Sequence, residues 1–244
     1  MNMNTKSIFS IIALAAGLQL AGAGNITGTV TLKGTPPPEK PITPVMEDPT
    51  CGKMHTEVPM TRFYVVGANN GLGDVIVMLK GYGKSTGASA TPVVMDQKGC
   101  LYTPQILAVQ TGQKIIIRNS DPVMHNVHAV PAVEGNAEQN APQMQGAADL
   151  SFSFDKPENF LKFKCDVHTW MLAWVTVIDS PYFAVTDKDG KFTIKDVPPG
   201  KYTVVAMHRK LSLVTPSPAT YKGMEQEVEV TADGGKADFT MEVK

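Results

Sequence analysis

The sequence predicts an all-β protein, and three observations carry that prediction. Short runs rich in valine, isoleucine and threonine alternate between apolar and polar residues along the chain. The 21 glycines and 18 prolines punctuate these runs, as turn residues do. No long stretch repeats its apolar residues at the helical period. The 244 residues are enough for one large core or two small ones.

The first 23 residues have the three parts of a secretory signal peptide. Lys6 lies in a short polar start, residues 8–20 are almost entirely apolar, and residues 21–23 read Ala-Gly-Ala, an A-x-A cleavage pattern. The apolar run is shorter than the roughly 20 residues that a membrane span needs. We therefore expect cleavage near Ala23 and a periplasmic or secreted mature chain. An uncleaved N-terminal anchor is the alternative.

Cleavage at that point removes one of the 22 basic residues and none of the 23 acidic ones, so the formal net charge changes from −1 to −2. A chain this close to neutral lacks the basic excess that nucleic acid or an anionic membrane surface attracts. No later stretch is apolar enough to span a membrane. We expect neither nucleic acid as a partner nor a membrane span in the mature chain.

The N-terminal part of the mature chain contains two strand-like runs and a connector. Residues 25–34 alternate as a strand does, and residues 73–81 form a second such run. Residues 35–44 between them are rich in proline, which lacks the N–H that a sheet needs. We expect a connector there.

The central part contains a closer series of strand-like runs. Residues 131–148 interrupt the series and are polar, so we expect a long loop there. The expected strands are residues 91–96, 106–119, 125–130, 151–157, 160–165 and 171–179.

From Pro181 the alternating pattern begins again. The sequences DKDG at 187–190 and PPG at 198–200 are turn signals between alternating runs. This restart indicates a second β unit at the C-terminal end.

One seven-residue stretch concentrates side chains that bind metals. Cys165, His168 and Met171 recur at intervals of three, so in a straight strand they would point to alternating faces. They converge if the chain leaves one strand at Cys165 and enters the next near Met171. A thiolate, an imidazole and a weak thioether, completed by a second histidine, form the donor set of a mononuclear copper site.

Two upstream histidines compete to complete that set. His125 begins a strand-like run, and His128, three positions further, would face the opposite side of the strand. We expect only one of them to bind metal, and Asn126 directly after His125 favours His125.

These residues resemble the motifs of the cupredoxins, the type 1 blue copper proteins of the amicyanin and plastocyanin kind. The motif N-x-D-x3-H-N-V begins at Asn119, and the motif C-x2-H-x2-M begins at Cys165. The resemblance covers about residues 91–179. The loop at 131–148 departs from it, because it is longer and more polar than in small cupredoxins.

The resemblance implies a Greek-key β-sandwich that holds one type 1 copper. His125, Cys165 and His168 would bind the metal, with Met171 as the axial ligand, and Asn126 would tie the two ligand loops together by hydrogen bonds. In the family the second histidine, here His168, lies at the surface in an apolar patch and passes electrons. The residues expected to contribute to that patch are Trp170, Leu172 and Pro181.

Other interpretations of the same residues are weaker. A single buried cysteine or methionine in a strand is often only core material, but four matching groups in order favour a metal. A structural zinc site would normally use more thiolates or histidines in place of methionine. A binuclear copper centre needs a second cysteine in the ligand loop. Cysteine catalysis lacks an oxyanion turn and an orienting acid here, so we do not expect an enzyme.

Cys51 and Cys100 are the other two cysteines. In an exported chain a disulfide between them is expected, and it leaves Cys165 as the free thiol that a copper site requires. The alternative is a second metal site at Cys51 and His55, which have a C-x3-H spacing. His208 is expected at the surface end of a strand.

Residues 183–206 resemble the carboxypeptidase regulatory-like modules, which are small transthyretin-like β-sandwiches. The match rests on the D-x-D-G, P-P-G-x-Y and alternating strand residues of that stretch. Such modules open with a strand like residues 28–34, which here lie far upstream. We therefore expect that the two ends of the chain form one sandwich in which the cupredoxin is nested, with a tandem arrangement as the alternative. The expected units are a signal peptide (1–23), an N-terminal β segment (24–90), a cupredoxin domain (91–179) and the regulatory-like sandwich (180–244).

These expectations combine into a function. The chain is expected to be a periplasmic, mononuclear type 1 copper protein that transfers single electrons between redox protein partners. A copper carrier or storage protein would use the same ligands, and a noncatalytic structural or adhesion protein would rely on the C-terminal sandwich.

Overall fold

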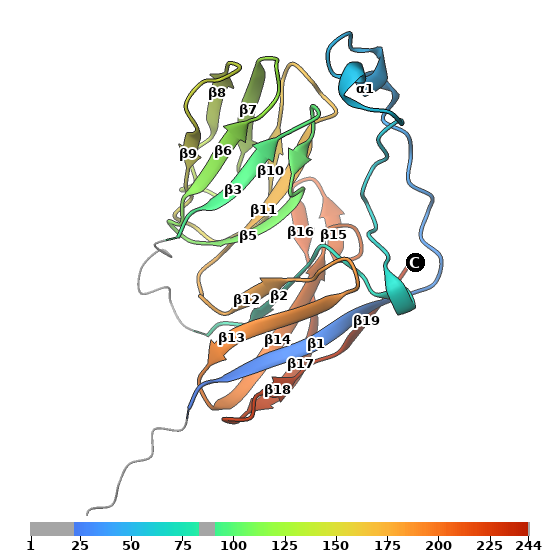
Figure 1. Cartoon of the computed structure of the whole chain (residues 1–244). Coiled ribbons are helices and arrows are strands. Elements are labelled where there is room, and N and C mark those ends of the chain that lie inside the picture. The colour runs from blue at the N-terminus through green and yellow to red at the C-terminus, as the bar shows by residue number, and fades with distance from the viewer. Residues whose placement is uncertain (1–21, 83–90, 244) are drawn as a thin grey trace, which may run out of the picture.

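The computed structural model describes residues 22–82 and 91–243 and shows an all-β protein (Figure 1). In these residues the exceptions to strands and loops are α1 (Thr43–Glu47) and two 3₁₀ turns, Gly52–Met54 and Ala68–Asn70. Most of the expected signal peptide lies outside the described residues. Within the part described, no helix is long and apolar enough to cross a membrane.

The first sandwich consists of two sheets from the central part of the chain. One sheet has the strand order β5-β11-β10-β7-β8, and the other β4-β3-β6-β9. The strands of the first sheet are β5 (Ile106–Gln110), β7 (His125–Val130), β8 (Gln139–Gln143), β10 (Glu158–Lys164) and β11 (Leu172–Ile178). Those of the second sheet are β3 (Val93–Gln97), β4 (Tyr102–Thr103), β6 (Ile115–Asn119) and β9 (Leu150–Phe152).

Alternation along the strands fills the core of the first sandwich. In β7, His125, Val127 and Ala129 are buried, whereas the residues between them are partly exposed. The same period of two turns Leu161 and Phe163 of β10 inward, and both are buried. His125 therefore lies on the inner face of its strand, at the end where β7 begins.

The second sandwich also consists of two sheets. One has the order β13-β1-β18 with β19 also paired to β1, and the other β12-β2-β14-β17. The strands of the first are β1 (Gly24–Lys33), β13 (Lys191–Val197), β18 (Gly235–Lys236) and β19 (Phe239–Glu242). Those of the second are β2 (Val75–Leu79), β12 (Phe183–Val185), β14 (Gly200–His208) and β17 (Met224–Val230). A separate hairpin joins β15 (Leu213–Pro216) and β16 (Ala219–Tyr221).

Both sheets of the second sandwich combine the two ends of the chain. β1 lies antiparallel to β13 and parallel to β19, and β2 lies antiparallel to β12 and β14. β1 and β2 precede the first sandwich in sequence, whereas their partners follow it. The described strands therefore follow the nested arrangement and not the tandem one.

The single strand expected over residues 106–119 is two strands. A turn separates β5 from β6, and in it Gly112 has a positive φ of 72°, a conformation that favours glycine. β5 pairs with β11 in one sheet, whereas β6 pairs with β3 and β9 in the other. The expectation was wrong because the polar turn at residues 111–114 (Thr-Gly-Gln-Lys) is short, and the apolar runs on both sides of it resemble one continuous strand.

The loop expected at residues 131–148 contains a strand. β8 pairs antiparallel with β7, with Gln143 opposite His125. β8 is an edge strand with the sequence Gln-Asn-Ala-Pro-Gln, which contains a proline and no alternating hydrophobic side chains, so the sequence pattern does not indicate a strand. The expectation of a loop throughout this range was therefore wrong.

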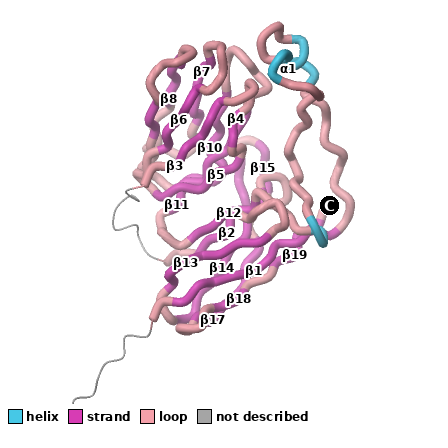
Figure 2. Tube along the Cα trace, in the orientation of Figure 1, coloured by secondary structure: helices cyan, strands magenta, loops and turns pink. Residues whose placement is uncertain are grey.

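Residues 35–71 form an arm that leaves the second sandwich after β1 and returns before β2. Its two limbs run side by side, joined by hydrogen bonds such as Thr61 N to Lys40 O (2.8 Å), and α1 lies at its tip (Figure 1). The arm is almost entirely loop (Figure 2). Val45 of α1 is buried in the core of the first sandwich, so the tip of the arm is packed against that sandwich.

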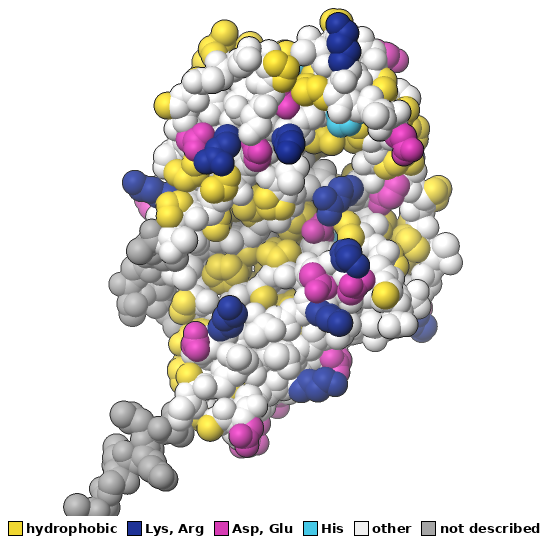
Figure 3. Space-filling model, in the orientation of Figure 1, with side chains coloured by type: hydrophobic (Ala, Val, Ile, Leu, Met, Phe, Trp, Pro, Cys, Tyr) yellow, Lys and Arg dark blue, Asp and Glu magenta, His cyan; other side chains and the backbone are white. Residues whose placement is uncertain are grey.

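The two sandwiches pack against each other through a further apolar cluster. It contains Ile106 and Trp174 of the first sandwich and Ile76 and Met207 of the second. On the face drawn in Figure 3, hydrophobic side chains gather in the hollow between the sandwiches, and charges of both signs are interspersed around it.

His208 ends β14, as expected, but it is buried and not at the surface. Its ring stacks on that of Tyr64 in the arm, with 5.4 Å between the ring centroids. Burial, followed by the neighbouring charge of Arg209, lowers the pKa of His208 to about 4. His208 is buried because Tyr64 of the arm covers this strand end, a contact between distant residues that no local sequence pattern indicates.

Candidate metal centre

The loop between β10 and β11 carries Cys165, His168 and Met171. β10 ends at Lys164 and β11 begins at Leu172. Two backbone hydrogen bonds close the loop, from Cys165 N to Met171 O (3.2 Å) and from Met171 N to His168 O (2.8 Å). The three residues therefore lie in a loop, and their side chains need not point to alternating faces as they would in a strand.

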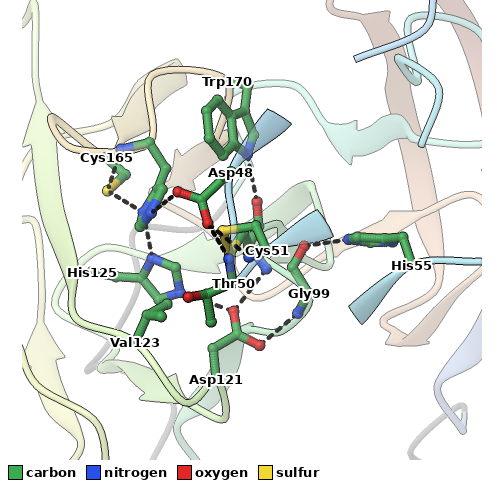
Figure 4. Close-up of a disulfide and its surroundings, with 12 residues drawn as sticks. Asp48, Thr50, Cys51, His55, Gly99, Asp121, Val123, His125, Cys165 and Trp170 are labelled. Carbon is green, nitrogen blue, oxygen red and sulfur yellow. Dashed lines mark hydrogen bonds and ion pairs between the residues drawn. A yellow bond between two sulfur atoms is a disulfide. The ribbon is translucent and has the colours of Figure 1, made fainter. Parts of the chain in front are cut away.

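Three of the expected ligand atoms converge beside this loop (Figure 4). Nδ1 of His125 lies 3.0 Å from Nδ1 of His168, which in turn lies 3.8 Å from Sγ of Cys165. The three side chains offer ligand atoms that all lie within 4.8 Å of one another. All three residues are buried, with exposed fractions of 0%, 5% and 1% for His125, His168 and Cys165.

The hydrogen bonds around the sulfur of Cys165 favour its thiolate form. The backbone N–H groups of Asn126 and His168 both donate to Sγ at 3.3 Å. Burial raises the pKa of this thiol, but interaction with His125 and the backbone N–H donors outweigh burial, so the pKa lies below its usual value. These contacts favour the ionised form that binds metals.

Asp121 fixes the other nitrogen of His125. Its Oδ2 lies 2.8 Å from Nε2 of His125, and the carboxylate also accepts hydrogen bonds from the backbone N–H groups of Gly99 (2.6 Å) and Cys100 (2.7 Å). Burial raises the pKa of Asp121, yet His125 and these donors bring the pKa below its usual value. Burial conversely lowers the pKa of His125, but Asp121 and Cys165 raise it more.

Metal-binding histidines commonly donate their second ring N–H to a carboxylate, which sets the tautomer and the ring orientation. Asp121 belongs to the N-x-D-x3-H-N-V motif, but no role was expected for it from the sequence. The signal was present as the Asp-x3-His spacing of Asp121 and His125.

Asn126 joins the two ligand segments. Its Oδ1 accepts a hydrogen bond from the backbone N–H of Asp166 (3.1 Å), the residue after Cys165. Its side-chain amide also donates to Asn140 in β8. This is the tie that the cupredoxin resemblance implies for Asn126.

Met171 is fully buried and belongs to the same core cluster as Cys165. It ends the ligand loop, and its backbone makes both of the hydrogen bonds that close the loop. The fourth expected ligand therefore lies at the inner end of the same loop.

His128 lies apart from the cluster. Its Nδ1 is 2.8 Å from Oδ2 of Asp166, and its Nε2 contacts Glu138. Its side chain is turned to the outer face of β7, away from that of His125. The cluster of possible ligand atoms around Cys165 and His168 contains His125 and not His128.

A disulfide joins Cys51 of the arm to Cys100 of the first sandwich, and Cys165 is the free cysteine. Both bridged residues are fully buried, and their sulfurs lie beside His168. His55 instead places its Nε2 at 2.7 Å from the carbonyl oxygen of Gly99. Because its sulfur is in a disulfide, Cys51 offers no thiolate for the alternative metal site at Cys51 and His55.

The expectation that His168 lies at the surface was wrong. Its exposed fraction is 5%, because the arm covers its outer edge with Asp48 and the Cys51 disulfide (Figure 4). Trp170 lies beside it, with ring centroids 5.3 Å apart, and donates its indole N–H to Cys100 O at 3.0 Å.

The patch expected around His168 is also not formed as predicted. Leu172 is half-buried at the start of β11, and Pro181 is exposed beyond the opposite end of that strand. Pro181 cannot share a patch with His168 because the length of β11 separates them.

The residues present fit a copper ion. Two imidazole nitrogens and a sulfur held by two N–H donors converge in a buried site, and a buried methionine ends the same loop. This donor chemistry matches a His₂Cys set with a weak methionine ligand.

Comparisons with known proteins concern parts of the chain. Residues 181–240 match the family model of the second beta sandwich domain of NOMO1-like subunits of the BOS complex. No curated protein matches the chain.

Among solved structures, the chain is similar to a Cu-containing nitrite reductase from Thermus scotoductus SA-01, with 20% identity over 37% of this chain and 23% of that one, at a TM-score of 0.33. It is also similar to an oxidised proline-to-glycine variant of amicyanin, with 23% identity over 42% of this chain and 98% of that one, again at a TM-score of 0.33. A Cu(I) methionine-to-alanine variant of amicyanin gives the same values.

Proposed function

We propose that this chain is an exported, mononuclear type 1 copper protein that transfers single electrons. His125, Cys165 and His168 would hold the copper, with Met171 as a weak fourth ligand. The observation that carries the proposal is the convergence of two Nδ1 atoms and one sulfur within 4.8 Å in a buried site.

Bound copper would supply a one-electron couple between Cu(II) and Cu(I). The protein's part is to hold the ligands still, because a site that changes little between the two states exchanges electrons with little reorganisation. Asp121 orients the ring of His125, and two backbone N–H groups orient the sulfur of Cys165. Packing in the core of the first sandwich restrains Cys165 and Met171.

A copper carrier or storage protein is the second candidate, since it would use the same ligands. Burial of the ligands favours electron transfer instead, because a metal held at a site with exposed fractions of 5% or less exchanges slowly with other carriers. A purely structural or adhesion role would not explain why His125, Cys165 and His168 converge in one buried site.

We propose no catalytic role. A cleft of about 730 Å³ lies between the sandwiches, lined by residues such as Met78, Val177 and Tyr221, and none of the four candidate ligands lines it. The partners that suit the proposal are redox proteins of the periplasm, or of the exterior if the chain is secreted.

The test is to add Cu(II) to the mature protein and to record its visible and EPR spectra. The proposal predicts one bound copper per chain, intense thiolate-to-Cu(II) absorption and the narrow copper hyperfine splitting of a type 1 site. Weak absorption with an ordinary tetragonal EPR spectrum would contradict it. Reversible one-electron voltammetry would then separate electron transfer from storage.

A further inference from the structure

The outer nitrogen of His168 faces a carboxylate of the arm. Nε2 of His168 lies 3.9 Å from Oδ2 of Asp48 (Figure 4). Nδ1 of His168 points into the ligand cluster. When Nδ1 binds a metal, a neutral imidazole keeps its proton on Nε2, which is the atom that faces Asp48.

Asp48 is held in this position by its neighbours. Its Oδ1 accepts hydrogen bonds from the backbone N–H groups of Thr50 (2.9 Å) and Cys51 (2.8 Å), and its Oδ2 is left on the side of His168. Two such donors favour the ionised carboxylate, which is also the ordinary form of an aspartate at neutral pH.

The segment that carries Asp48 is fastened to the first sandwich on both sides. Val45, three residues before Asp48, is buried in the sandwich core, and Cys51, three residues after it, is bonded to Cys100. The carbonyl of Cys100 also accepts the indole N–H of Trp170 from the ligand loop. Asp48 is thus placed against His168 by an apolar anchor and by a covalent bond.

Each histidine of the cluster therefore has a carboxylate beside its Nε2, in hydrogen-bond contact at His125 (2.8 Å) and at the longer distance of 3.9 Å at His168. Asp121 faces Nε2 of His125, and Asp48 faces Nε2 of His168, each from outside the ligand cluster. Asp121 and Cys100 belong to the first sandwich, whereas Asp48 comes from the arm. The arm therefore contributes a residue to the surroundings of the metal centre and does not merely cover it.

We propose that Asp48 is a positioning residue of the copper centre that acts through His168: as a fixed negative charge 3.9 Å from Nε2 of His168, it favours the oxidised state of the copper. This inference rests on the function proposed above. A carboxylate outside a metal-binding histidine raises the basicity of the ligand and stabilises the more positive metal state. Loss of its charge should therefore raise the reduction potential.

The test compares Asp48→Asn with Glu47→Gln in the copper-loaded, full mature protein. Asparagine keeps an oxygen for the N–H groups of Thr50 and Cys51 and removes only the charge. Glu47 is the adjacent, exposed residue at the end of α1, so Glu47→Gln makes the same change of charge without facing His168. Asp48→Glu, which restores the charge, is the conservative variant.

The readouts are the reduction potential by voltammetry and the EPR spectrum of the Cu(II) form. We expect the potential to rise in Asp48→Asn by at least three times its rise in Glu47→Gln. We also expect a changed EPR spectrum in Asp48→Asn alone, and a partial return of both in Asp48→Glu. Mass spectrometry of the nonreduced variants checks that the Cys51–Cys100 bond is intact.

Equal shifts in Asp48→Asn and Glu47→Gln, or no shift in either, would overturn the role of Asp48 and leave the copper assignment standing. The absence of a type 1 spectrum in the wild-type protein would overturn both. If Asp48→Asn fails to fold, Asp48→Ser replaces it, because a hydroxyl oxygen can also accept the N–H groups of Thr50 and Cys51 but carries no charge. A potential and an EPR spectrum that change no more in Asp48→Ser than in Glu47→Gln would count against the role of Asp48.

Discussion

The Nδ1 atoms of His125 and His168 lie 3.0 Å apart, although 43 residues separate the two histidines in the chain. At that distance one nitrogen donates a hydrogen bond and the other accepts it. The two Nδ1 atoms therefore already face each other before any metal binds. Metal binding at this point displaces a proton, so metal uptake should release protons.

Replacement of Cys165 by serine should abolish the intense visible absorption of the Cu(II) protein. The colour of such a site comes from charge transfer between the thiolate and Cu(II), and a serine oxygen does not supply it. Sγ of Cys165 also accepts two backbone N–H groups, which a hydroxyl can still do, so the fold should persist. Absorption that survives in Cys165→Ser would show that the sulfur has been assigned wrongly.

The two histidines of β7 should respond differently to alanine. His125→Ala should weaken Cu(II) binding or open the site to small external ligands, because Nδ1 of His125 lies in the cluster. His128→Ala should do neither, because its ring contacts Asp166 and Glu138 on the outer face of β7. Copper titrations of both variants provide the measurement. Spectral loss in His128→Ala would reverse the assignment.

Asp121→Asn should lower copper affinity by about 10- to 100-fold, which is the usual effect of losing the carboxylate behind a metal-binding histidine. Competition with a copper chelator measures the change. Asp149→Asn is a suitable control, since Asp149 pairs at the surface with Arg118. Equal affinities in the two variants would mean that Asp121 supports only the loop at Gly99 and Cys100.

Met171→Gln should distinguish an electron carrier from a copper donor. A weak thioether ligand tunes the potential more than it strengthens binding. In an electron carrier the harder oxygen of glutamine should therefore lower the reduction potential, and copper should stay bound in both oxidation states.

In a copper donor the same substitution should release Cu(I) to a competing chelator much faster. Voltammetry and chelator titration of wild type and Met171→Gln provide the two measurements. Rapid loss of Cu(I) from the wild type itself would contradict the electron-transfer proposal.

Stability should fall as the pH decreases from about 6.5 to about 4, in part because of His208. The folded pKa of His208 is about 4, whereas an unfolded histidine has a pKa of about 6.5. Between these values the unfolded chain binds a proton that the folded chain does not, so acid favours unfolding. The contribution is fully present above pH 6.5, and its loss is about 3 kcal/mol once the pH has reached 4.

Denaturant unfolding of wild type and His208→Gln at pH 7, 5.5 and 4.5 measures this contribution. Glutamine offers both a donor and an acceptor at the same position. The stability of the variant should depend less steeply on pH than that of wild type. Parallel curves would show that His208 does not carry the effect.

The ligand loop was predictable from the sequence because its information is local. The spacing of Cys165, His168 and Met171 required a turn between two strands, and β10 and β11 end and begin at its edges. The period of two likewise separated His125 from His128. Local patterns of this kind do not depend on distant parts of the chain.

The burial of His168 was not predictable in the same way. The arm is rich in proline and has no periodic pattern, so the sequence contains no sign of where it docks. Its position depends on contacts between distant residues, such as the Cys51–Cys100 disulfide and the entry of Val45 into the core. β8 was missed for a related reason, because its backbone pairs with β7 while its sequence, Gln-Asn-Ala-Pro-Gln, has no hydrophobic alternation.

The parallel pairing of β1 with β19, with Val30 opposite Phe239, has a consequence for the order of folding. A chain that emerges with its N-terminus first presents β1 about 160 residues before β13 exists and about two hundred residues before β19 exists. The first sandwich can close early from contacts of its own, whereas β1 must wait as an unpaired strand. Such distant pairings fold slowly and expose sheet edges to aggregation. The pairing of β19 with β1 is therefore the folding step at which a chaperone that shields exposed strands would matter most.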